Sequence, residues 1–453
     1  MEIWAEQALL TTGWAQDVRV SIGDDGRITG VQPGAARAGA QAAGILLPAP
    51  ANAHSHAFQR AMAGLTERRG PDPRDSFWTW RALMYRFLDH LTPDHVQAIA
   101  ALVQMEMLEA GYACNVEFHY LHHQPGGVPY PNLAEMSERI IAATAQSGIG
   151  LTLLPVQYQY GGLDRRPLGA GQIRFGNEFE RFARLYQGAA AALAHLPGDC
   201  RIGVAPHSLR AVGPEALAQI AALTDGPVHM HLAEQQAEVE EVMAALGARP
   251  VEWVLDNMEL HSGVTLIHCT QMLPHETTAL AQSGAVAGLC PITEASLGDG
   301  IFDAVRWFDA GGAVAIGSDS NIRIALAEEL RLLEYSQRLR DRARAVLASP
   351  AHSTGRRLFQ AAAQGGARAA GRASGAIAPG MQADLMALDA THLDLAGRQG
   401  DAVLDSFIFA GDSRMVQHVW SAGRHVVKAG QHINRQEIMA AYRKAMRDLG
   451  QTL

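Results

Sequence analysis

Two histidines separated by one serine, His54 and His56, end a short apolar run that begins at Ile45. Side chains alternate between the two faces of a strand, so both imidazoles point to the same side and could chelate one metal ion. By itself, this pair is about as compatible with packing or surface roles as with metal binding. Its place at the end of a predicted strand favours the metal.

A second histidine pair, His229 and His231, ends the run that starts at Pro227, and Glu234 follows three residues after the second histidine. The carboxylate lies just beyond the predicted strand, where it can face a ligand. A satisfied core histidine and a helix-capping glutamate are the structural alternative for this motif.

Two further apolar runs end in His268 and Asp319. Four predicted strands therefore end, in chain order, in a histidine pair, a histidine pair with a glutamate, a histidine and an aspartate. A single strand-end histidine is often structural, but this ordered series is hard to reach by accident. It predicts one polar site where the four strand ends meet.

The elements that must position these residues are short apolar runs alternating with Ala- and Leu-rich helical stretches, a pattern typical of βα units and a parallel sheet. Eight strands over roughly 270 residues fit a (β/α)8 barrel, whose catalytic residues gather at the C-terminal ends of the strands. The predicted strands span residues 45–54, 113–118, 150–156, 201–205, 227–231, 264–268, 285–289 and 313–317.

Both chain ends differ from the middle of the chain in their pattern of apolar and polar residues. Short alternating runs broken by turn residues extend to about residue 47, and a hairpin over 415–427, followed by a helix from Arg435, closes the chain. Such patterns predict small antiparallel strands. We expect the two ends to build one small β-unit together.

The charge balance limits the possible partners. Lys+Arg 37 against Asp+Glu 46 gives a formal net charge of −9, and no basic run is present, so we expect no nucleic-acid partner. No charged-then-apolar leader begins at Met1, and no apolar run reaches the roughly 20 residues that cross a bilayer. The 4 cysteines are too widely spaced for a disulfide framework or a zinc-thiolate site. We expect a cytoplasmic protein without a membrane partner.

The strand-end residues resemble the amidohydrolase superfamily, in the branch of cytosine-, guanine- and adenosine-type deaminases, over nearly the whole chain. The segment from Gly375 to Leu385 is similar to the one that returns the chain from barrel to β-sandwich there, although by itself it could be only a turn before a strand. The resemblance implies an α/β fold with a (β/α)8 TIM-type barrel over residues 48–375. It also implies a small β-sandwich domain from residues 1–47 and 376–453, and a homodimer.

Carried over residue by residue, the resemblance implies that four side chains hold the metal, while Glu234 and His268 act on substrate and water together with Asp319. The implied metal ligands are His54, His56, His231 and Asp319. His229 is then a supporting or core residue.

Lysine bears on the number of metal ions. Two-metal members of the superfamily usually bridge their ions with a carboxylated lysine, but only Lys428 and Lys444 occur here, which favours one divalent metal per chain. Zinc is favoured for a His₃Asp site, with iron or manganese as alternatives. A metal lowers the pKa of bound water from roughly 15.7 to about 7, and this water can attack a carbon that bears an amino group. Glu234 can then protonate the departing nitrogen.

Further segments resemble the formimidoylglutamate deiminase family of histidine degradation. They are residues 58–62, 76–81, 117–120 and 205–212. In that family five side chains hold the two carboxylates of the substrate, and the matching residues are Gln59, Arg81, Tyr120, His207 and Arg210. Forked guanidinium groups suit carboxylates, although both arginines could instead pair with neighbouring acids. The implied reaction converts N-formimino-L-glutamate to N-formyl-L-glutamate and ammonia.

Three alternatives stay open at this point. A guanine-type ring deaminase would keep the metal ligands but favour aromatic stacking over paired arginines. A relative that hydrolyses a ring amide, such as imidazolonepropionase, would share the carboxylate-bearing substrate, whereas a non-catalytic binding relative would be expected to lose ligands. The residues also leave open cleavage at the glutamate nitrogen, although the family favours loss of ammonia. We expect His119, His122 and His123 to be loop residues.

Overall fold

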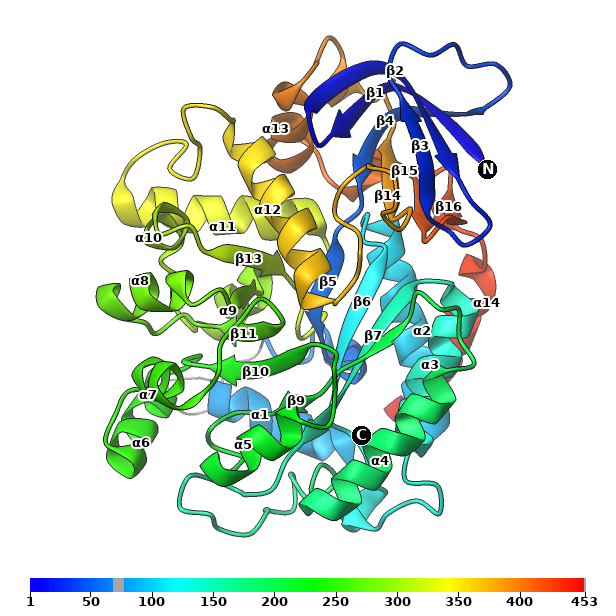
Figure 1. Cartoon of the computed structure of the whole chain (residues 1–453). Helices are drawn as coiled ribbons and strands as arrows, with labels where there is room; N and C mark the ends of the chain where they lie inside the picture. The colour runs from blue at the N-terminus through cyan, green and yellow to red at the C-terminus, as the bar shows by residue number, and fades with distance from the viewer. Residues whose placement is uncertain (68–76, 452–453) are drawn as a thin grey trace.

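The two chain ends meet in one sheet. The computed structural model describes residues 1–67 and 77–451. Eight strands follow the order β17-β16-β15-β14-β4-β1-β2-β3, in the upper part of Figure 1. These strands are β1 (Glu2–Leu10), β2 (Gly13–Ile22), β3 (Ile28–Gln32), β4 (Gln41–Pro48), β14 (Leu385–Leu388), β15 (Val416–Ser421), β16 (Arg424–Lys428) and β17 (Gln431–His432). The expected hairpin is β15 with β16, and strands from both chain ends share this one sheet.

The middle of the chain contains two parallel sheets. One has the order β5-β6-β7-β8, with β9 beside β7, and the other has the order β10-β11-β12-β13. Isolated parallel bridges link the two sheets at both edges, between Val204 and Val228 and between Ser55 and Asp319. The strands are β5 (Ala51–Ser55), β6 (Cys114–His119), β7 (Gly150–Gln157), β8 (Arg201–Ile202), β9 (Ala205–Pro206), β10 (Val228–Leu232), β11 (Val264–His268), β12 (Val286–Leu289) and β13 (Ala313–Ile316).

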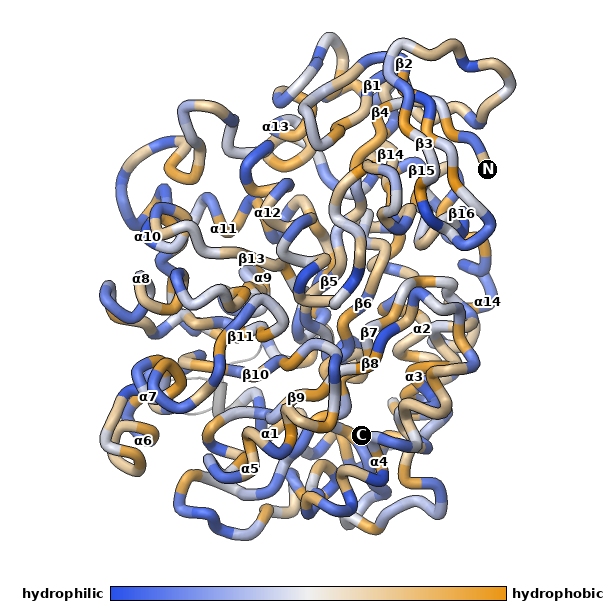
Figure 2. Tube along the Cα trace, in the orientation of Figure 1, coloured by the Kyte–Doolittle hydropathy of each residue, from blue (hydrophilic) through white to orange (hydrophobic). Residues whose placement is uncertain are grey.

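Helices surround these central strands (Figure 1). Every residue of β6, β7 and β10 is buried, as expected for parallel strands covered on both faces. Figure 2 shows hydrophobic residues along the central strands and hydrophilic residues recurring on the outer helices and loops. The helices are η1 (Ala57–Met62), α1 (Phe77–Leu88), α2 (Pro93–Glu109), η2 (Pro125–Gly127), α3 (Glu135–Ser147), α4 (Phe179–Leu193), α5 (Pro214–Ala221), α6 (Gln236–Leu246), α7 (Pro250–Asn257), α8 (Pro274–Gln282), α9 (Pro291–Leu297), α10 (Ala304–Asp309), α11 (Leu326–Asp341), α12 (Thr354–Ala369), η3 (Leu393–Leu395), α13 (Asp401–Phe409), η4 (Ser413–Met415) and α14 (Arg435–Gly450). Within the described part of the chain, none of them is both long and apolar enough to cross a bilayer.

Two predicted strands are divided in the structure. The predicted strand over 45–54 is two strands in the structure. Its first part belongs to β4 in the terminal sheet and its second part to β5 in a central sheet, with Pro48 and Pro50 at the junction. Proline has no N–H to donate to a strand ladder, so the apolar run cannot continue as one strand. The predicted strand over 201–205 is split into β8 and β9 at Gly203, where a Cβ would collide with the Pro227 carbonyl oxygen.

A buried ionic cluster joins the terminal sheet to the central sheets. Arg372 donates from Nε and Nη2 to the two carboxylate oxygens of Asp384, at 2.9 Å each, and Nη2 lies 3.1 Å from Asp199 Oδ2. Arg424 on β16 donates to the same Asp199 carboxylate at 2.8 Å. Asp199 precedes β8 and Asp384 precedes β14, so these charges connect both parts of the fold while satisfying one another.

Helix α12 packs against the amino ends of two central strands through adjacent glycines. A Cβ on Gly365 would collide with the backbone of Val314 in β13, and a Cβ on Gly366 would lie 2.9 Å from the carbonyl oxygen of Ala51 in β5. The helix therefore approaches the strands more closely than a side chain permits. This contact lies at the strand ends opposite those that carry the predicted site.

We expect Gly365→Ala to lower the free energy of unfolding by roughly 1–3 kcal/mol, the usual cost of overpacking. Gly450→Ala is the matched control, because Gly450 also lies in a helix but a Cβ there would meet nothing within 4 Å. Thermal unfolding followed by circular dichroism measures both variants. Equal midpoints for the two variants would contradict the close approach.

Candidate active site

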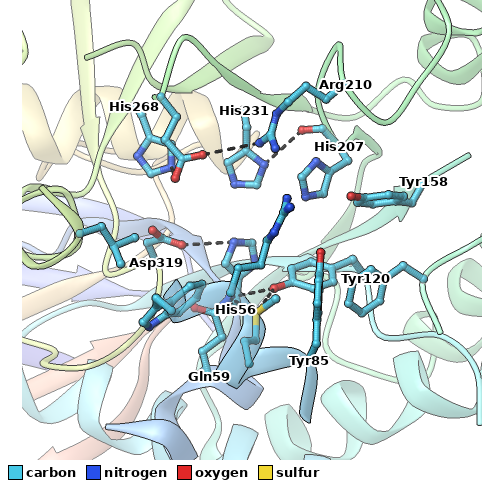
Figure 3. A pocket seen from close by; sticks show the side chains of 16 residues that line it. His56, Gln59, Tyr85, Tyr120, Tyr158, His207, Arg210, His231, His268 and Asp319 are labelled. Atoms are coloured by element: carbon cyan, nitrogen blue, oxygen red, sulfur yellow. Dashed lines mark hydrogen bonds and ion pairs between the residues drawn. The ribbon is translucent and has the colours of Figure 1, made fainter. Parts of the chain in front are cut away.

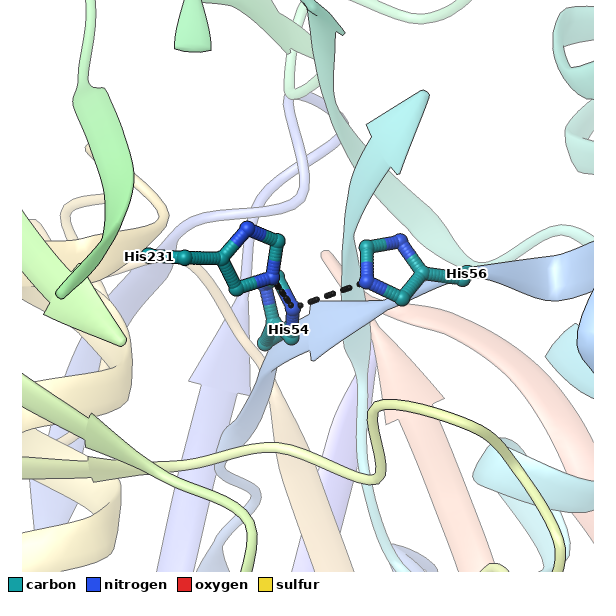
Figure 4. Close-up of side chains that lie close together, drawn as sticks. All are labelled: His54, His56 and His231. Carbon is teal, nitrogen blue, oxygen red and sulfur yellow. Dashed lines mark hydrogen bonds between the residues drawn. The ribbon is translucent and has the colours of Figure 1, made fainter. Parts of the chain in front are cut away.

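Four donor atoms converge where β5, β10 and β13 end. His54 Nε2 lies 3.2 Å from His56 Nε2 and 3.1 Å from His231 Nε2 (Figure 4). Asp319 Oδ1 lies 3.2 Å from His56 Nε2 and 3.5 Å from His54 Nε2. All four side chains are buried. The predicted metal ligands are therefore brought together.

In two of these rings, a hydrogen bond from Nδ1 holds Nε2 toward the point where the four donor atoms converge. His56 Nδ1 donates to the Phe118 carbonyl oxygen at 3.0 Å, and His231 Nδ1 donates to the His207 carbonyl oxygen at 3.1 Å. A neutral imidazole that donates from Nδ1 keeps a lone pair on Nε2. Burial, followed by the neighbouring histidines, lowers the pKa values of His54 and His231, which favours neutral rings.

This donor set fits a divalent cation. Nitrogen lone pairs that face one another at 3.1–3.2 Å repel unless a proton or a cation lies between them. Zn–N bonds of about 2.0–2.1 Å in tetrahedral geometry place two ligand nitrogens about 3.3 Å apart. Burial acts to raise the pKa of Asp319, but the hydrogen bond with His56 and the charges of His56 and His268 together outweigh it and hold this pKa below its ordinary value. Asp319 therefore adds a negative charge to the three imidazoles.

Several strand ends adopt a left-handed backbone conformation. The φ angles are 72° at His268, 53° at Cys269 and 44° at Asp319. Residues other than glycine rarely adopt this conformation, and it persists where the surrounding structure over-determines it, often at active sites. Two of these three residues are predicted catalytic residues, so the strain coincides with the predicted site.

Glu234 and His268 form a buried pair beside the donor atoms. His268 Nε2 lies 3.8 Å from Glu234 Oε1, and His268 Nδ1 lies 3.3 Å from Glu294 Oε1. Burial raises the pKa of Glu234. Burial alone would lower the pKa of His268, but the carboxylates of Glu234 and Glu294 outweigh it and raise this pKa to about 10. The pair therefore retains a proton near neutral pH.

A pocket opens beside these groups (Figure 3). All the predicted catalytic and substrate-binding residues line it, whereas His54 lies behind the lining. Gln59 on η1 donates to the Tyr120 hydroxyl at 2.8 Å, which joins two of the predicted substrate contacts. The lining residues are His56, Gln59, Trp80, Arg81, Met84, Tyr85, Tyr120, Tyr158, Phe175, His207, Arg210, His231, Glu234, His268, Leu297 and Asp319.

Arg81 and Arg210 bring two positive charges into this pocket. Burial lowers the pKa of Arg81, and the charge of Arg210 lowers it further. Burial acts against the charge of Arg210 as well, but Glu238 and Glu234 outweigh it and raise its pKa. Arg210 Nη2 lies 3.9 Å from Glu234 Oε2. An anionic ligand between the arginines would relieve their mutual repulsion.

Sequence reasoning missed part of the lining. Two of the missed residues lie three and four positions after Arg81 on α1, a spacing that places them on the same helix face and could have revealed them. A third directly follows the last residue of β7, where strand-end residues are expected to face the site. The remaining two come from loop and helix-end positions without a sequence signal. In this order these residues are Met84, Tyr85, Tyr158, Phe175 and Leu297. Trp80, which belongs to the segment 76–81 but has no predicted role, lines the pocket as well.

The other histidines have structural surroundings. His229 Nε2 donates to the Ala369 carbonyl oxygen at 2.8 Å, which confirms the core role expected for it. The loop prediction is wrong for His119, because the pairing of β6 with β7 continues through this residue. His122 and His123 follow β6 in a loop, but both are buried and donate to backbone carbonyls of neighbouring segments. The aromatic stretch begins at Ser76, which lies outside the described residues.

Comparisons with known proteins agree with this geometry. A family model described as "Amidohydrolase family" matches residues 45–426. A second one, described as "Formimidoylglutamate deiminase HutF, N-terminal domain", matches residues 1–44.

Individual relatives match over nearly the whole chain. The formimidoylglutamate deiminase of Pseudomonas aeruginosa is 46% identical over 451 residues, which covers 99% of both chains. The crystal structure of an amidohydrolase from Brucella melitensis matches with a TM-score of 0.95 and 47% identity, over 99% of each chain. An adenosine deaminase from Xanthomonas campestris with bound zinc, at 21% identity and a TM-score of 0.82 over 99% and 98% of the two chains, shares the fold. This chain belongs to the formimidoylglutamate deiminase family of the amidohydrolases.

Proposed function

We propose that this chain is a metal-dependent deiminase of histidine degradation that hydrolyses N-formimino-L-glutamate to N-formyl-L-glutamate and ammonia. The observation that carries the proposal is the presence of two partly buried arginines in the same pocket as a His₃Asp donor set. The arginines suit a dicarboxylate, and the donor set suits metal-assisted hydrolysis. Membership of the family supports the same activity.

The finer architecture is part of the proposal. We propose a closed (β/α)8 barrel over residues 48–375, together with a small β-sandwich domain from residues 1–47 and 376–453. The bridges that link the parallel sheets at both edges support the barrel, and the sheet shared by both chain ends supports the second domain. We also propose a homodimer, which rests on the family resemblance alone, and a cytoplasmic location, which rests on the sequence analysis above.

The proposed cofactor is one divalent metal, held by His54, His56, His231 and Asp319. Zinc is favoured because three neutral imidazoles and one carboxylate are typical zinc donors, and iron is the alternative. When bound, such a metal makes a water molecule nucleophilic near neutral pH.

The remaining groups of the site orient the water and move its proton. We assign the orientation of the water to His268 and Asp319. The water oxygen bonds to the formimino carbon, and Glu234 takes the two water protons in turn, first at attack and then from the resulting hydroxyl, and delivers both to the terminal nitrogen. The bond between that carbon and that nitrogen then breaks, so ammonia leaves and the formyl group stays on glutamate. The raised pKa of Glu234, caused by burial, suits a group that must hold this proton.

The far part of the pocket is assigned to the two carboxylates of the substrate. The proposed contacts are Gln59, Arg81, Tyr120, His207 and Arg210. A guanine-type ring deaminase could use the same metal donors. Two neighbouring positive charges, however, favour a dianion over a neutral ring, so a ring substrate is the less favoured alternative.

We expect one metal ion per chain at the convergent donors. Metal analysis of the purified protein should give one equivalent, and anomalous scattering should place it between His54, His56, His231 and Asp319. Two adjacent ions, or an ion elsewhere, would rule out the single-site proposal.

We expect Glu234→Gln to fold and keep its metal but to lose at least ~10²-fold in turnover, because proton transfer by a positioned group contributes that much. Steady-state assays of ammonia release measure the loss, and metal analysis is the control. Near-normal turnover, or loss of the metal, would show that Glu234 does not have this role.

Arg81→Met and Arg210→Met should each lower kcat/KM by about 30-fold or more with unchanged metal content. Leaving a buried charge without its partner costs roughly 2–5 kcal/mol, and about 1.4 kcal/mol is tenfold. Arg60→Met is the matched control, since Arg60 donates to Glu106 at 2.7 Å and does not line the pocket. Ammonia release is measured with formiminoglutamate and with guanine. Turnover of guanine without turnover of formiminoglutamate would refute the proposed substrate.

A further inference from the structure

One buried carboxylate next to the site takes no part in the reaction described above. Glu294 lies on α9, behind His268 and outside the pocket lining. Its Oε1 lies 3.3 Å from His268 Nδ1 and accepts the Cys290 backbone N–H at 2.8 Å. Glu294 Oε1 therefore accepts from both His268 Nδ1 and the Cys290 N–H. The Cys290 backbone, at the start of α9, holds this oxygen in place.

The plane of the His268 ring is held independently of Glu294. This ring stacks on His231 at 5.5 Å between centroids and 11° between planes. Stacking does not determine which ring nitrogen faces the pocket, because a half-turn of the ring about its Cβ–Cγ bond exchanges the two sides within the same plane. An acceptor beside one ring nitrogen distinguishes the two orientations, and the nearer of the two carboxylates is Glu294, whose Oε1 lies 3.3 Å from Nδ1 while Glu234 Oε1 lies 3.8 Å from Nε2.

We propose that Glu294 is a positioning residue, which accepts from His268 Nδ1 and so holds Nε2 toward the substrate and the attacking water. The proposal rests on the proposed function, because it concerns the role of His268 in that reaction. A buried carboxylate that holds a catalytic imidazole through Nδ1 is an established way to fix the orientation of the ring.

The same three residues could also be considered as a second metal site, because His268, Cys290 and Glu294 place potential ligand atoms within 4.8 Å of one another. Burial, however, raises the pKa of the Cys290 thiol well above its ordinary value, and the thiolate is the form that binds metals. His268 Nδ1 and Glu294 Oε1 already bond to each other. The geometry therefore favours positioning over metal binding.

The test compares Glu294→Ala with Glu294→Gln in the metal-loaded protein. We expect the alanine variant to lose about 10- to 100-fold in kcat, with KM within about threefold of wild type and one metal retained. The glutamine variant should recover most of this loss, because the Cys290 N–H selects the amide orientation that keeps a carbonyl oxygen at the Oε1 position. Crystal structures of both variants should show His268 turned in the alanine variant and unchanged in the glutamine variant.

Glu276→Ala is the matched control for removing a buried carboxylate. Glu276 accepts the Leu273 N–H at 2.6 Å at the start of α8 and the Arg249 Nε at 2.9 Å, and it does not line the pocket. This variant should lower the melting temperature while its kcat stays near that of wild type.

The outcomes separate the two proposals. A wild-type protein that does not turn over formiminoglutamate contradicts the proposed function, and the orientation of His268 in the two variant structures then decides the positioning role alone. Wild-type kcat in Glu294→Ala, an unchanged His268 ring in that variant, or a glutamine variant as impaired as the alanine variant overturns the positioning role. Loss of metal in step with activity overturns it as well.

Discussion

Buried imidazole lone pairs that face one another are the constraint on which the rest of this structure depends. His54, His56 and His231 each direct Nε2 toward the same point, and water cannot solvate these atoms from the outside. A cation at that point converts a repulsive arrangement into a favourable one. The rings keep this direction because two of them donate from Nδ1 to backbone carbonyls at Phe118 and His207. The positions of the three Nε2 atoms therefore depend on the register between the strands that carry the histidines and the neighbouring strands that supply these carbonyls.

Charge is distributed unevenly around this centre. The end of the pocket with the proposed metal donors has imidazoles and one carboxylate, whereas the far part of the pocket contains Arg81 and Arg210. Glu234 belongs to both regions, because it lies near His268 on one side and 3.9 Å from Arg210 on the other. A dianionic ligand would compensate the arginines and leave Glu234 free to exchange its proton with the reacting nitrogen. In the proposed reaction, substrate binding and proton transfer are thus electrostatically linked through Glu234.

The side chains proposed as metal ligands and catalytic groups could be placed together from the sequence because their signals are local. Alternation along a strand places His54 and His56 on one face, and strand ends in chain order add His231, His268 and Asp319. The division of the first predicted strand was missed because apolar residues continue on both sides of Pro48. The contact of Glu294 with His268 could not be predicted either. His268 lies 26 positions earlier in the chain, and the packing of α9 brings the two side chains together.

The far part of the pocket depends on a different kind of support. Arg81 comes from α1, and the carbonyl of Leu88 at the end of that helix accepts a hydrogen bond from the buried Arg174. Arg174 also donates to the Leu91 carbonyl at 3.1 Å and to the His123 carbonyl at 2.8 Å, and it adjoins the pocket residue Phe175. The metal donors are thus fixed by strands and their ladders, whereas α1 is fixed by side-chain links between loops. The pocket residues on α1, Arg81 among them, therefore depend on contacts separate from those that hold the proposed metal donors.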